Sequence, residues 1–202
     1  MRPLSLAGLA AVSLWSAVSH ADELSAPELG RLLAGTTVAR AQTLERGDQR
    51  YVGGVTYTVV DAAPDEVASL LDDVRGWRRF LPRTRDAERV GSAGADPLVE
   101  LTHGSALVRV AYTLRVHRDG NVVRFWLDRS RPHDIEDAWG FFRAETMPSG
   151  QTLLTYGVLI DMGAGLMRDM FEERVLQLAL AVPENIRKLA VTRSGSRRHA
   201  SR

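Results

Sequence analysis

The chain has 202 residues, of which 45% are hydrophobic and 25% charged, a composition typical of a globular domain with a hydrophobic core. It contains no cysteine, which excludes disulfides, a thiol nucleophile, thiolate metal sites and iron–sulfur clusters. The formal net charge is +1, but residues 22–191 hold 25 acidic and 21 basic residues. That part of the chain lacks the basic field of a nucleic-acid-binding protein, so we expect no nucleic-acid partner.

The first 21 residues have the layout of a secretory signal peptide. Arg2 precedes an apolar run over residues 4–18, and residues 19–21 form a small-x-small ending. The alternative is a retained membrane anchor, but the run is shorter than the roughly 20 residues that a spanning helix needs. The sequence therefore predicts cleavage near Ala21 and a periplasmic or secreted protein.

Residues 22–50 are expected to form an N-terminal helix followed by a connector. In residues 22–35, Ser25 suits the cap position, Pro27 lies near the helix start and Gly35 ends it. Residues 36–50 are polar and are interpreted as the connector. The alternating, β-branched run over residues 51–62 then predicts the first strand.

Two short helices should follow that strand. Pro64 suits the first helical position. Apolar side chains then repeat at helical spacing: Val67, Leu70, Leu71 and Val74. Gly76 interrupts this helix, and residues 77–81 leave room for a second one that ends before Pro82.

About six strands should occupy the next part of the chain. Alternation is clearest over residues 106–117, where the even-numbered residues are apolar and several odd-numbered ones are polar, typical of an antiparallel sheet with one solvated face. Asp119 and Gly120 predict a tight hairpin turn. Residues 152–162 return the chain after a turn over residues 147–151.

A long helix is predicted from Leu166 to about Val191, with a kink at Pro183 because proline cannot donate the backbone hydrogen bond. Residues 192–202 form a basic tail that we expect to be disordered. Helices before and after an unbroken run of strands indicate an α+β domain.

Two stretches, VVDAAPDEVASLLDDVRGWRRFLP and GFFRAETMPSGQTLLTYGVLIDMGAGLMRDMFEERVLQLALAVPENIRKLA, resemble the START-like (SRPBCC) superfamily. The resemblance covers residues 51–191 and is strongest to the polyketide cyclase/dehydrase and coenzyme Q-binding type. It implies a helix-grip fold: a curved antiparallel sheet of about seven strands, two short helices after strand 1, and a long C-terminal helix. The implied ligand is a lipid, isoprenoid, quinone or polyketide-like molecule between sheet and helix. The superfamily has no universal catalytic motif, so no catalytic residue is assigned.

On this fold the inward faces of the strands and the C-terminal helix should line the ligand cavity. The predicted lining residues are Val108, Val110, Tyr112, Leu114, Phe125, Phe142, Tyr156, Val158, Met167, Met170 and Phe171. The second short helix should border the cavity mouth as a lid, with Trp77, Phe80 and Leu81. The alternative is that these side chains fill a closed core.

Polar candidates are few. His103 lies on the apolar side of its strand and could contact a ligand, as could Tyr112 and Tyr156. His133 and Asp134 are interpreted as part of a solvated loop. Metal-binding spacings, the G-x-S-x-G nucleophile motif and a phosphate-binding loop are absent from the sequence, and we expect neither a metal nor a cofactor.

The sequence thus favours an exported, non-catalytic binder or carrier of a hydrophobic small molecule. Two alternatives remain open: a cyclase or aromatase-like enzyme that uses the same cavity, and an envelope interaction module with a closed cavity. Arginines around the second short helix, such as Arg78 and Arg79, suggest transient contact with an anionic membrane surface. The sequence leaves the oligomeric state open.

Overall fold

The computed structural model describes residues 24–104 and 108–200, with side chains described except at residues 166–167 and 193–200. The predicted signal peptide over residues 1–21 therefore lies outside the described residues. The elements in chain order are α2 (Ala26–Leu33), β1 (Val38–Arg46), β2 (Gln49–Val60), α3 (Pro64–Asp72), the 3-10 helix η2 (Val74–Arg79), β3 (Thr84–Ala93), β4 (Asp96–Gly104), β5 (Arg109–Asp119), β6 (Val122–Leu127), β7 (Asp137–Thr146), β8 (Thr152–Asp161), α4 (Leu166–Leu180) and α5 (Val182–Ala200).

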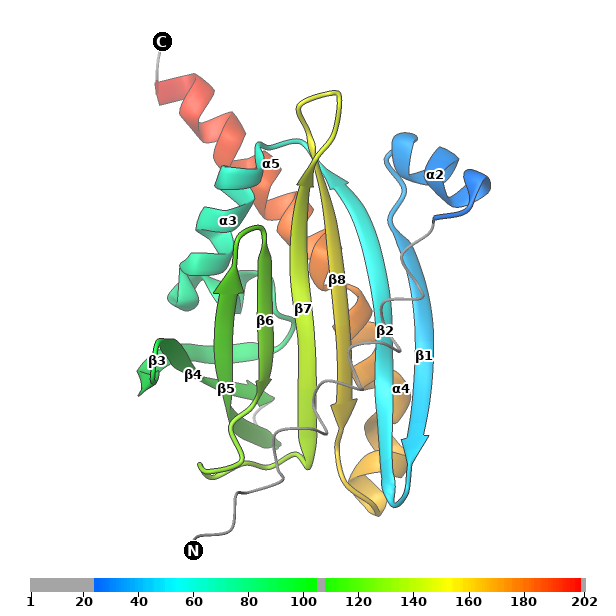
Figure 1. The fold of residues 1–202 in the computed structure, drawn as a ribbon, viewed down its shortest axis with the longest axis vertical. Helices are drawn as coiled ribbons and strands as arrows, with labels where there is room; N and C mark the ends of the chain where they lie inside the picture. Colours follow the sequence, from blue (N-terminus) through cyan, green and yellow to red (C-terminus); the bar gives the residue numbers. More distant parts are fainter. Residues whose placement is uncertain (1–23, 105–107, 201–202) are drawn as a thin grey trace, which may run out of the picture.

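The strands form one antiparallel eight-stranded sheet in the order β1-β2-β8-β7-β6-β5-β4-β3. Consecutive strands pair as hairpins, except that β2 pairs with β8 and so places the first hairpin beside the last strand. Two register shifts in β3 bend its end of the sheet. Figure 1 shows β3 and β4 crossing the direction of β7 and β8, with α4 and α5 lying behind the long strands. This is the predicted curved α+β architecture.

Strand β1 corrects the prediction that residues 36–50 form a connector. Its residues pair along their whole length with β2, from Val38 opposite Tyr57 to Arg46 opposite Gln49. The strand lies at the sheet edge and alternates between buried or half-buried and exposed side chains, so most of its residues are polar. Gly54 permits the close pairing, since a Cβ there would lie 2.0 Å from the carbonyl oxygen of Arg40. The sheet therefore has one strand more than the seven expected.

The two helices after β2 form where the sequence placed them, but the second is a 3-10 helix. Helix α3 has Pro64 at its start and buries three apolar side chains, Val67, Leu70 and Leu71. Asp73 then caps η2 by accepting a hydrogen bond from the N–H of Gly76 at 3.1 Å. A Cβ at Gly76 would lie 2.5 Å from Asp73 Oδ2, so a side chain at this position would displace the capping carboxylate.

The C-terminal helix is broken rather than kinked. Helix α4 ends at Leu180, Ala181 separates the two segments, and α5 restarts at Val182. Pro183 explains the break, because it cannot donate to the preceding turn yet fits the first turn of a new helix. Helix α5 then runs to Ala200, which corrects the expectation of a disordered tail.

Hydrophobic residues pack on both faces of the sheet. The larger cluster joins the concave face to α3, η2 and α5 through residues such as Leu154, Phe142 and Ile186. The smaller cluster lies on the opposite face, where Tyr51 and Trp139 are buried with Leu32 of α2. The sheet is therefore not simply solvated on one side. Within the described residues, no helix combines the length and hydrophobicity needed to span a bilayer.

Candidate functional site

A cavity of about 470 Å³ lies between the concave face of the sheet, the η2–β3 connection and α4. Its wall is mainly apolar and comes from β5, β6, β7 and β8 on one side and from α4 on the other. The alternation of side chains along each strand explains this wall, because every second residue of β5 and β8 points to the concave face.

Most of the residues that the sequence assigned to the cavity line it in the structure. Nine come from the predicted wall: Val108, Val110, Tyr112, Leu114, Phe125, Phe142, Tyr156, Val158 and Phe171. Trp77 and Leu81 line it from the η2 side, and His103 from β4. That a ligand binds in this cavity stays a prediction.

Phe80 and Met170 do not line the cavity, and the side chain of Met167 lies outside the described residues. Phe80 is 1% exposed and packs edge-on against Phe142, with ring centroids 6.5 Å apart. It is thus a core residue rather than part of a lid.

Met170 is 62% exposed. The cavity face of α4 is formed by Phe171, Val175 and Leu178, which repeat at i, i+4 and i+7. Met170 precedes the first of these and falls outside their stripe. The sequence prediction had assigned only Met167, Met170 and Phe171 of the long helix to the cavity wall, and of these three Phe171 lines it.

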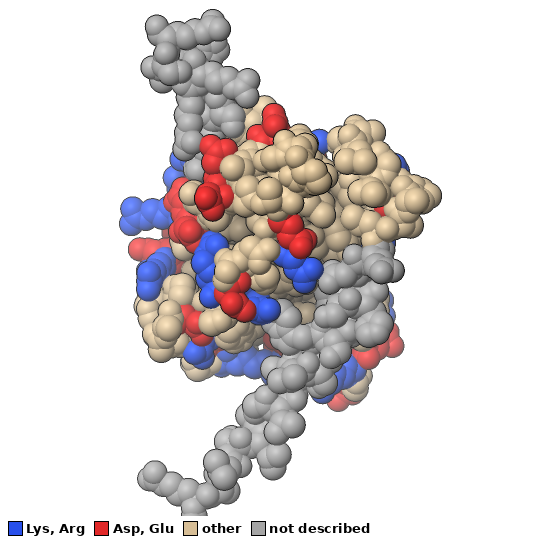
Figure 2. Space-filling model, turned by 45° about the horizontal axis from the view of Figure 1, so that its top comes forward, with Lys and Arg blue, Asp and Glu red and all other residues tan. Residues whose placement is uncertain are grey.

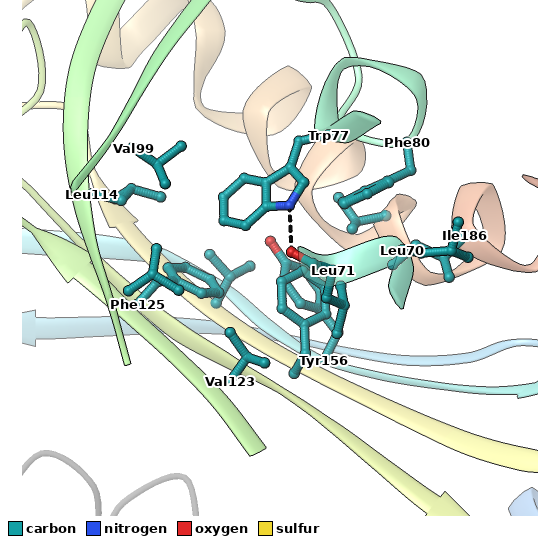
Figure 3. Packing of buried hydrophobic residues seen from close by; sticks show 14 of the residues in the cluster. Leu70, Leu71, Trp77, Phe80, Val99, Leu114, Val123, Phe125, Tyr156 and Ile186 are labelled. Atoms are coloured by element: carbon teal, nitrogen blue, oxygen red, sulfur yellow. Dashed lines mark hydrogen bonds between the residues drawn. The ribbon is translucent and has the colours of Figure 1, made fainter. Parts of the chain in front are cut away.

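Trp77 lines the cavity from the η2 side and is buried. Its ring is 3% exposed, and its indole N–H donates to the carbonyl of Leu71 at 2.8 Å. Figure 3 shows the ring between Val99 and Leu114 on one side and Phe80 on the other. This hydrogen bond ties η2 to the end of α3, so the position of the cavity wall depends on both helices.

Sequence reasoning missed several lining residues. They are Pro82, Arg83, Gly104, Asp134, Ile135, Ala138, Ile160, Met162, Arg174, Val175, Leu178, Ala179 and Val182. Alternation along β8 was sufficient to find Ile160 and Met162, which share a face with Tyr156. Nothing in the local pattern indicated Asp134, which is exposed as predicted but lies at the cavity rim. Its carboxylate accepts a hydrogen bond from the N–H of Ala111 at 2.8 Å.

His103 and Tyr112 form a hydrogen-bonded pair inside the cavity. The Tyr112 hydroxyl lies 2.9 Å from His103 Nε2, and the two rings stack with centroids 5.3 Å apart. On the other side of the ring, Nδ1 lies 3.0 Å from the hydroxyl of Thr84. Burial lowers the pKa of His103, with a smaller opposing effect of a hydrogen bond to the Pro82 carbonyl, and burial raises the pKa of Tyr112. Both groups are therefore uncharged near neutral pH.

Tyr156 presents a second hydroxyl to the cavity. Its ring stacks on Phe142 at a centroid distance of 4.6 Å, and burial raises the pKa of its hydroxyl. No described residue forms a hydrogen bond with this hydroxyl, whereas the Tyr112 hydroxyl has its histidine partner.

Among the described residues that line the cavity, the charged ones, Arg83, Asp134 and Arg174, are all exposed and lie at the rim. Arg83 is the one described non-glycine residue with positive φ, at 56°, and its carbonyl accepts from the N–H of Gly104 at 3.0 Å. The described part of the chain has no group of three or more His, Asp or Glu residues suited to a metal ion. On the face shown in Figure 2, acidic and basic side chains are interspersed rather than separated.

The buried histidine gives a prediction on pH dependence. Because the pKa of His103 is lowered by folding, the unfolded chain binds a proton below pH 6.5 that the folded chain does not, and acidification destabilises the fold. We expect His103→Gln to lose less thermal stability than the wild type as the pH falls from about 7 to about 5. The exposed His133→Gln is the control and should behave like the wild type. If the wild type, His103→Gln and His133→Gln all lost the same thermal stability on acidification, His103 would not be a neutral, buried group.

Comparisons with known proteins identify the fold. No family model matches the chain, and no curated protein is significantly similar to it in sequence. Among solved structures, the aromatase/cyclase ZhuI from Streptomyces sp. R1128 superposes with a TM-score of 0.60 and 21% identity, covering 72% of this chain and 96% of that one.

A STAR-related lipid transfer protein from Xanthomonas axonopodis also superposes with a TM-score of 0.60, at 15% identity over 76% of this chain and 93% of its own. A START superfamily protein from Mycobacterium smegmatis gives 0.53 at 15% identity over 68% and 92% of the two chains. These identities are too low to transfer a function. Together with the curved sheet and the C-terminal helices, they show that this chain has the helix-grip fold of START-like proteins.

Proposed function

We propose that the protein is a non-catalytic binder or carrier of a hydrophobic small molecule. The observation that carries this proposal is the cavity of about 470 Å³ with a mainly apolar wall. Cavities of about 300–1,000 Å³ accommodate drug-sized ligands. Each Å² of apolar surface removed from water contributes about 25 cal/mol, so the apolar body of the ligand supplies the affinity. Lipids, isoprenoids, quinones and polyketide-like molecules fit this description.

The second candidate function is a cyclase or aromatase-like reaction in the same cavity. The hydrogen bond between His103 and Tyr112 favours it, because an imidazole beside a phenol can relay a proton. Two features weigh against it. Burial moves the pKa of Tyr112 further above neutrality, which makes the phenol a weaker acid, and the carboxylate nearest the cavity, Asp134, lies at the exposed rim.

Native mass spectrometry and solvent extraction of the purified protein separate the two candidates. A carrier should retain an apolar molecule that is recovered unchanged after extraction. An enzyme should convert a polyketide-type substrate, with turnover lost in His103→Gln. Protein without bound molecule, also after incubation with lipid extract and quinones, would refute the carrier proposal.

For location we propose the periplasm or the cell exterior. The support is the apolar run over residues 4–18 with its small-x-small ending at Ala21. N-terminal sequencing of the protein recovered from cells should then begin at Asp22. An N-terminus at residue 1 or 2 would contradict export with cleavage.

We also propose transient contact between the η2 region and anionic lipid. Arg75, Arg78 and Arg79 are exposed, and no described acidic residue forms an ion pair with them. A Lys or Arg near an anionic membrane surface contributes about 1 kcal/mol of attraction. Removal of two such arginines should therefore weaken vesicle binding measurably.

A flotation assay tests this contact. We expect the protein to float with phosphatidylglycerol-containing vesicles and not with phosphatidylcholine vesicles, and the double variant Arg78→Gln/Arg79→Gln to lose several-fold of that binding. The control variant Arg31→Gln/Arg46→Gln removes the same charge from α2 and β1, beside the opposite sheet edge, and should float like the wild type. An equal loss of vesicle binding in both double variants would mean that binding depends on the net charge of the protein and not on the η2 region.

A further inference from the structure

Two arginines border the cavity without a charged partner in the protein. Arg83 lies in the connection between η2 and β3, and Arg174 lies on α4. Both are exposed, and no described residue forms an ion pair or a side-chain hydrogen bond with either guanidinium. Arginines elsewhere in the described chain, such as Arg50 and Arg115, bind carboxylates of the protein. The two rim guanidinium groups are therefore free to bind an anionic group of a ligand.

Backbone hydrogen bonds gather the exposed part of the wall at one end of β4 and β5. The carbonyl of Arg83 accepts from the N–H of Gly104, the last residue of β4, at 3.0 Å. Gly104 pairs with Arg109 at the start of β5. Two residues further along β5, the N–H of Ala111 donates to the carboxylate of Asp134 at 2.8 Å. The sheet side of the rim is therefore formed where these two strands meet the η2–β3 connection.

The backbone of Arg83 adopts a conformation that is unfavourable for a residue with a side chain. Its φ is 56°, and every other described residue with a positive φ is a glycine. Glycine adopts this conformation without strain, so the turn alone does not account for an arginine here. Non-glycine residues held in such conformations cluster at ligand-binding and active sites. The strained backbone thus supports a role for the Arg83 side chain at the cavity.

The charge of the rim favours an anion. Its charged residues are two arginines and one carboxylate, and no ion pair joins Asp134 to either arginine within the described residues. An arginine can lay its methylene groups along an apolar wall while its guanidinium stays in water, which explains how exposed residues line this cavity. Guanidinium groups bind carboxylate and phosphate oxygens through charge-assisted hydrogen bonds. The rim therefore offers such a group binding partners at the boundary between cavity and solvent.

We propose that the cavity takes an amphipathic ligand with one anionic group, a carboxylate or a phosphate ester, which stays at the rim beside Arg83 and Arg174 while the apolar body fills the cavity. Burial of the anion among the apolar wall residues would be costly, so the rim also fixes the orientation of the ligand. This inference rests on the proposed binding function, which it makes specific.

Fluorescence titration with three probes that share a pyrene ring and a butyl chain tests the proposal. Near neutral pH, 1-pyrenebutyric acid is anionic, 1-pyrenebutanol is neutral and 1-pyrenebutylamine is cationic. The wild type should bind the acid most tightly and the amine least. Arg83→Gln and Arg174→Gln should each weaken binding of the acid about threefold, and the double variant about tenfold, as expected for exposed charge pairs. The alcohol should bind unchanged, and the amine should bind more tightly because repulsion is removed.

The matched control is Arg31→Gln/Arg46→Gln, which removes the same charge outside the cavity wall and should bind all three probes like the wild type. Arg83→Gly removes the guanidinium where glycine adopts the backbone conformation without strain. It should weaken binding of the acid without lowering the melting temperature. Displacement of the bound acid by dodecanoate at a lower concentration than dodecyl phosphate would assign a carboxylate, and the reverse order a phosphate ester.

Two results would overturn the inference and leave the binding function intact. One is that the wild type binds the acid no more tightly than the alcohol. The other is that Arg83→Gln/Arg174→Gln and the control lose the same affinity for the acid, which would attribute the effect to the net charge of the protein. Failure of all three probes to bind would instead count against the binding function.

Discussion

Replacing Val110 with tryptophan is expected to reduce the retained apolar ligand at least about tenfold, because the indole occupies space that the ligand needs. Val110 is half-buried on β5, directly at the cavity wall. The cavity offers room for the larger side chain, so the free energy of unfolding should fall by less than about 1.5 kcal/mol. Native mass spectrometry of the wild-type and variant proteins, purified in parallel, measures the bound fraction.

The control for this substitution is Leu33→Trp on α2, where the native side chain is 65% exposed and remote from the cavity wall. It adds an indole of the same size and should leave retention unchanged. If Val110→Trp retained as much ligand as Leu33→Trp, the ligand would have to lie elsewhere in the protein. This comparison tests the cavity assignment without relying on the identity of the ligand.

Phe80→Ala should cost about 3–5 kcal/mol of the free energy of unfolding, the usual effect of removing a large aromatic side chain from a core. Phe80 is 1% exposed and packs against both Trp77 and Phe142, at centroid distances of 6.4 and 6.5 Å. Its removal leaves a void at the junction of η2 and β7, where the surrounding sheet can relax only partly. Urea unfolding followed by circular dichroism provides the measurement.

Met170→Ala provides the contrast, because the sequence assigned both residues to the ligand site. The Met170 side chain is 62% exposed, so its truncation should change stability by no more than about 0.5 kcal/mol and leave ligand retention unaltered. A large loss of retained ligand in Met170→Ala would mean that Met170 contacts the ligand, as the sequence predicted. A small stability loss in Phe80→Ala would contradict its place in the core.

Local patterns predicted much of the fold. The strict alternation along β5 placed Val110, Tyr112 and Leu114 on the concave face, where they line the cavity. Pro64 marked the start of α3, and Pro183 marked the place where the C-terminal helix is interrupted. These features follow from side-chain periodicity and from proline's missing N–H, which act within a few residues.

Other features had no local pattern to indicate them. Strand β1 is an edge strand whose pairing with β2 is made by the backbone, so its polar composition resembled a connector. Phe80 and Trp77 are three residues apart in the same short segment, yet only Trp77 lines the cavity. Phe80 is the residue after the last of η2, with a φ of −119°, and its ring packs against Phe142 in the core.

The amino-acid sequence by itself determined the fold class, the order of the elements and most of the apolar wall, since each depends on short-range periodicity. Only the tertiary structure decided the polar chemistry of the cavity. His103 and Tyr112 meet because β4 and β5 pair in a register that sets Val110 opposite His103, and Tyr156 joins them from β8, three strands away from β5 in the sheet. The hydrogen bond between His103 and Tyr112 depends on the pairing of two strands, and no spacing along the chain encodes it.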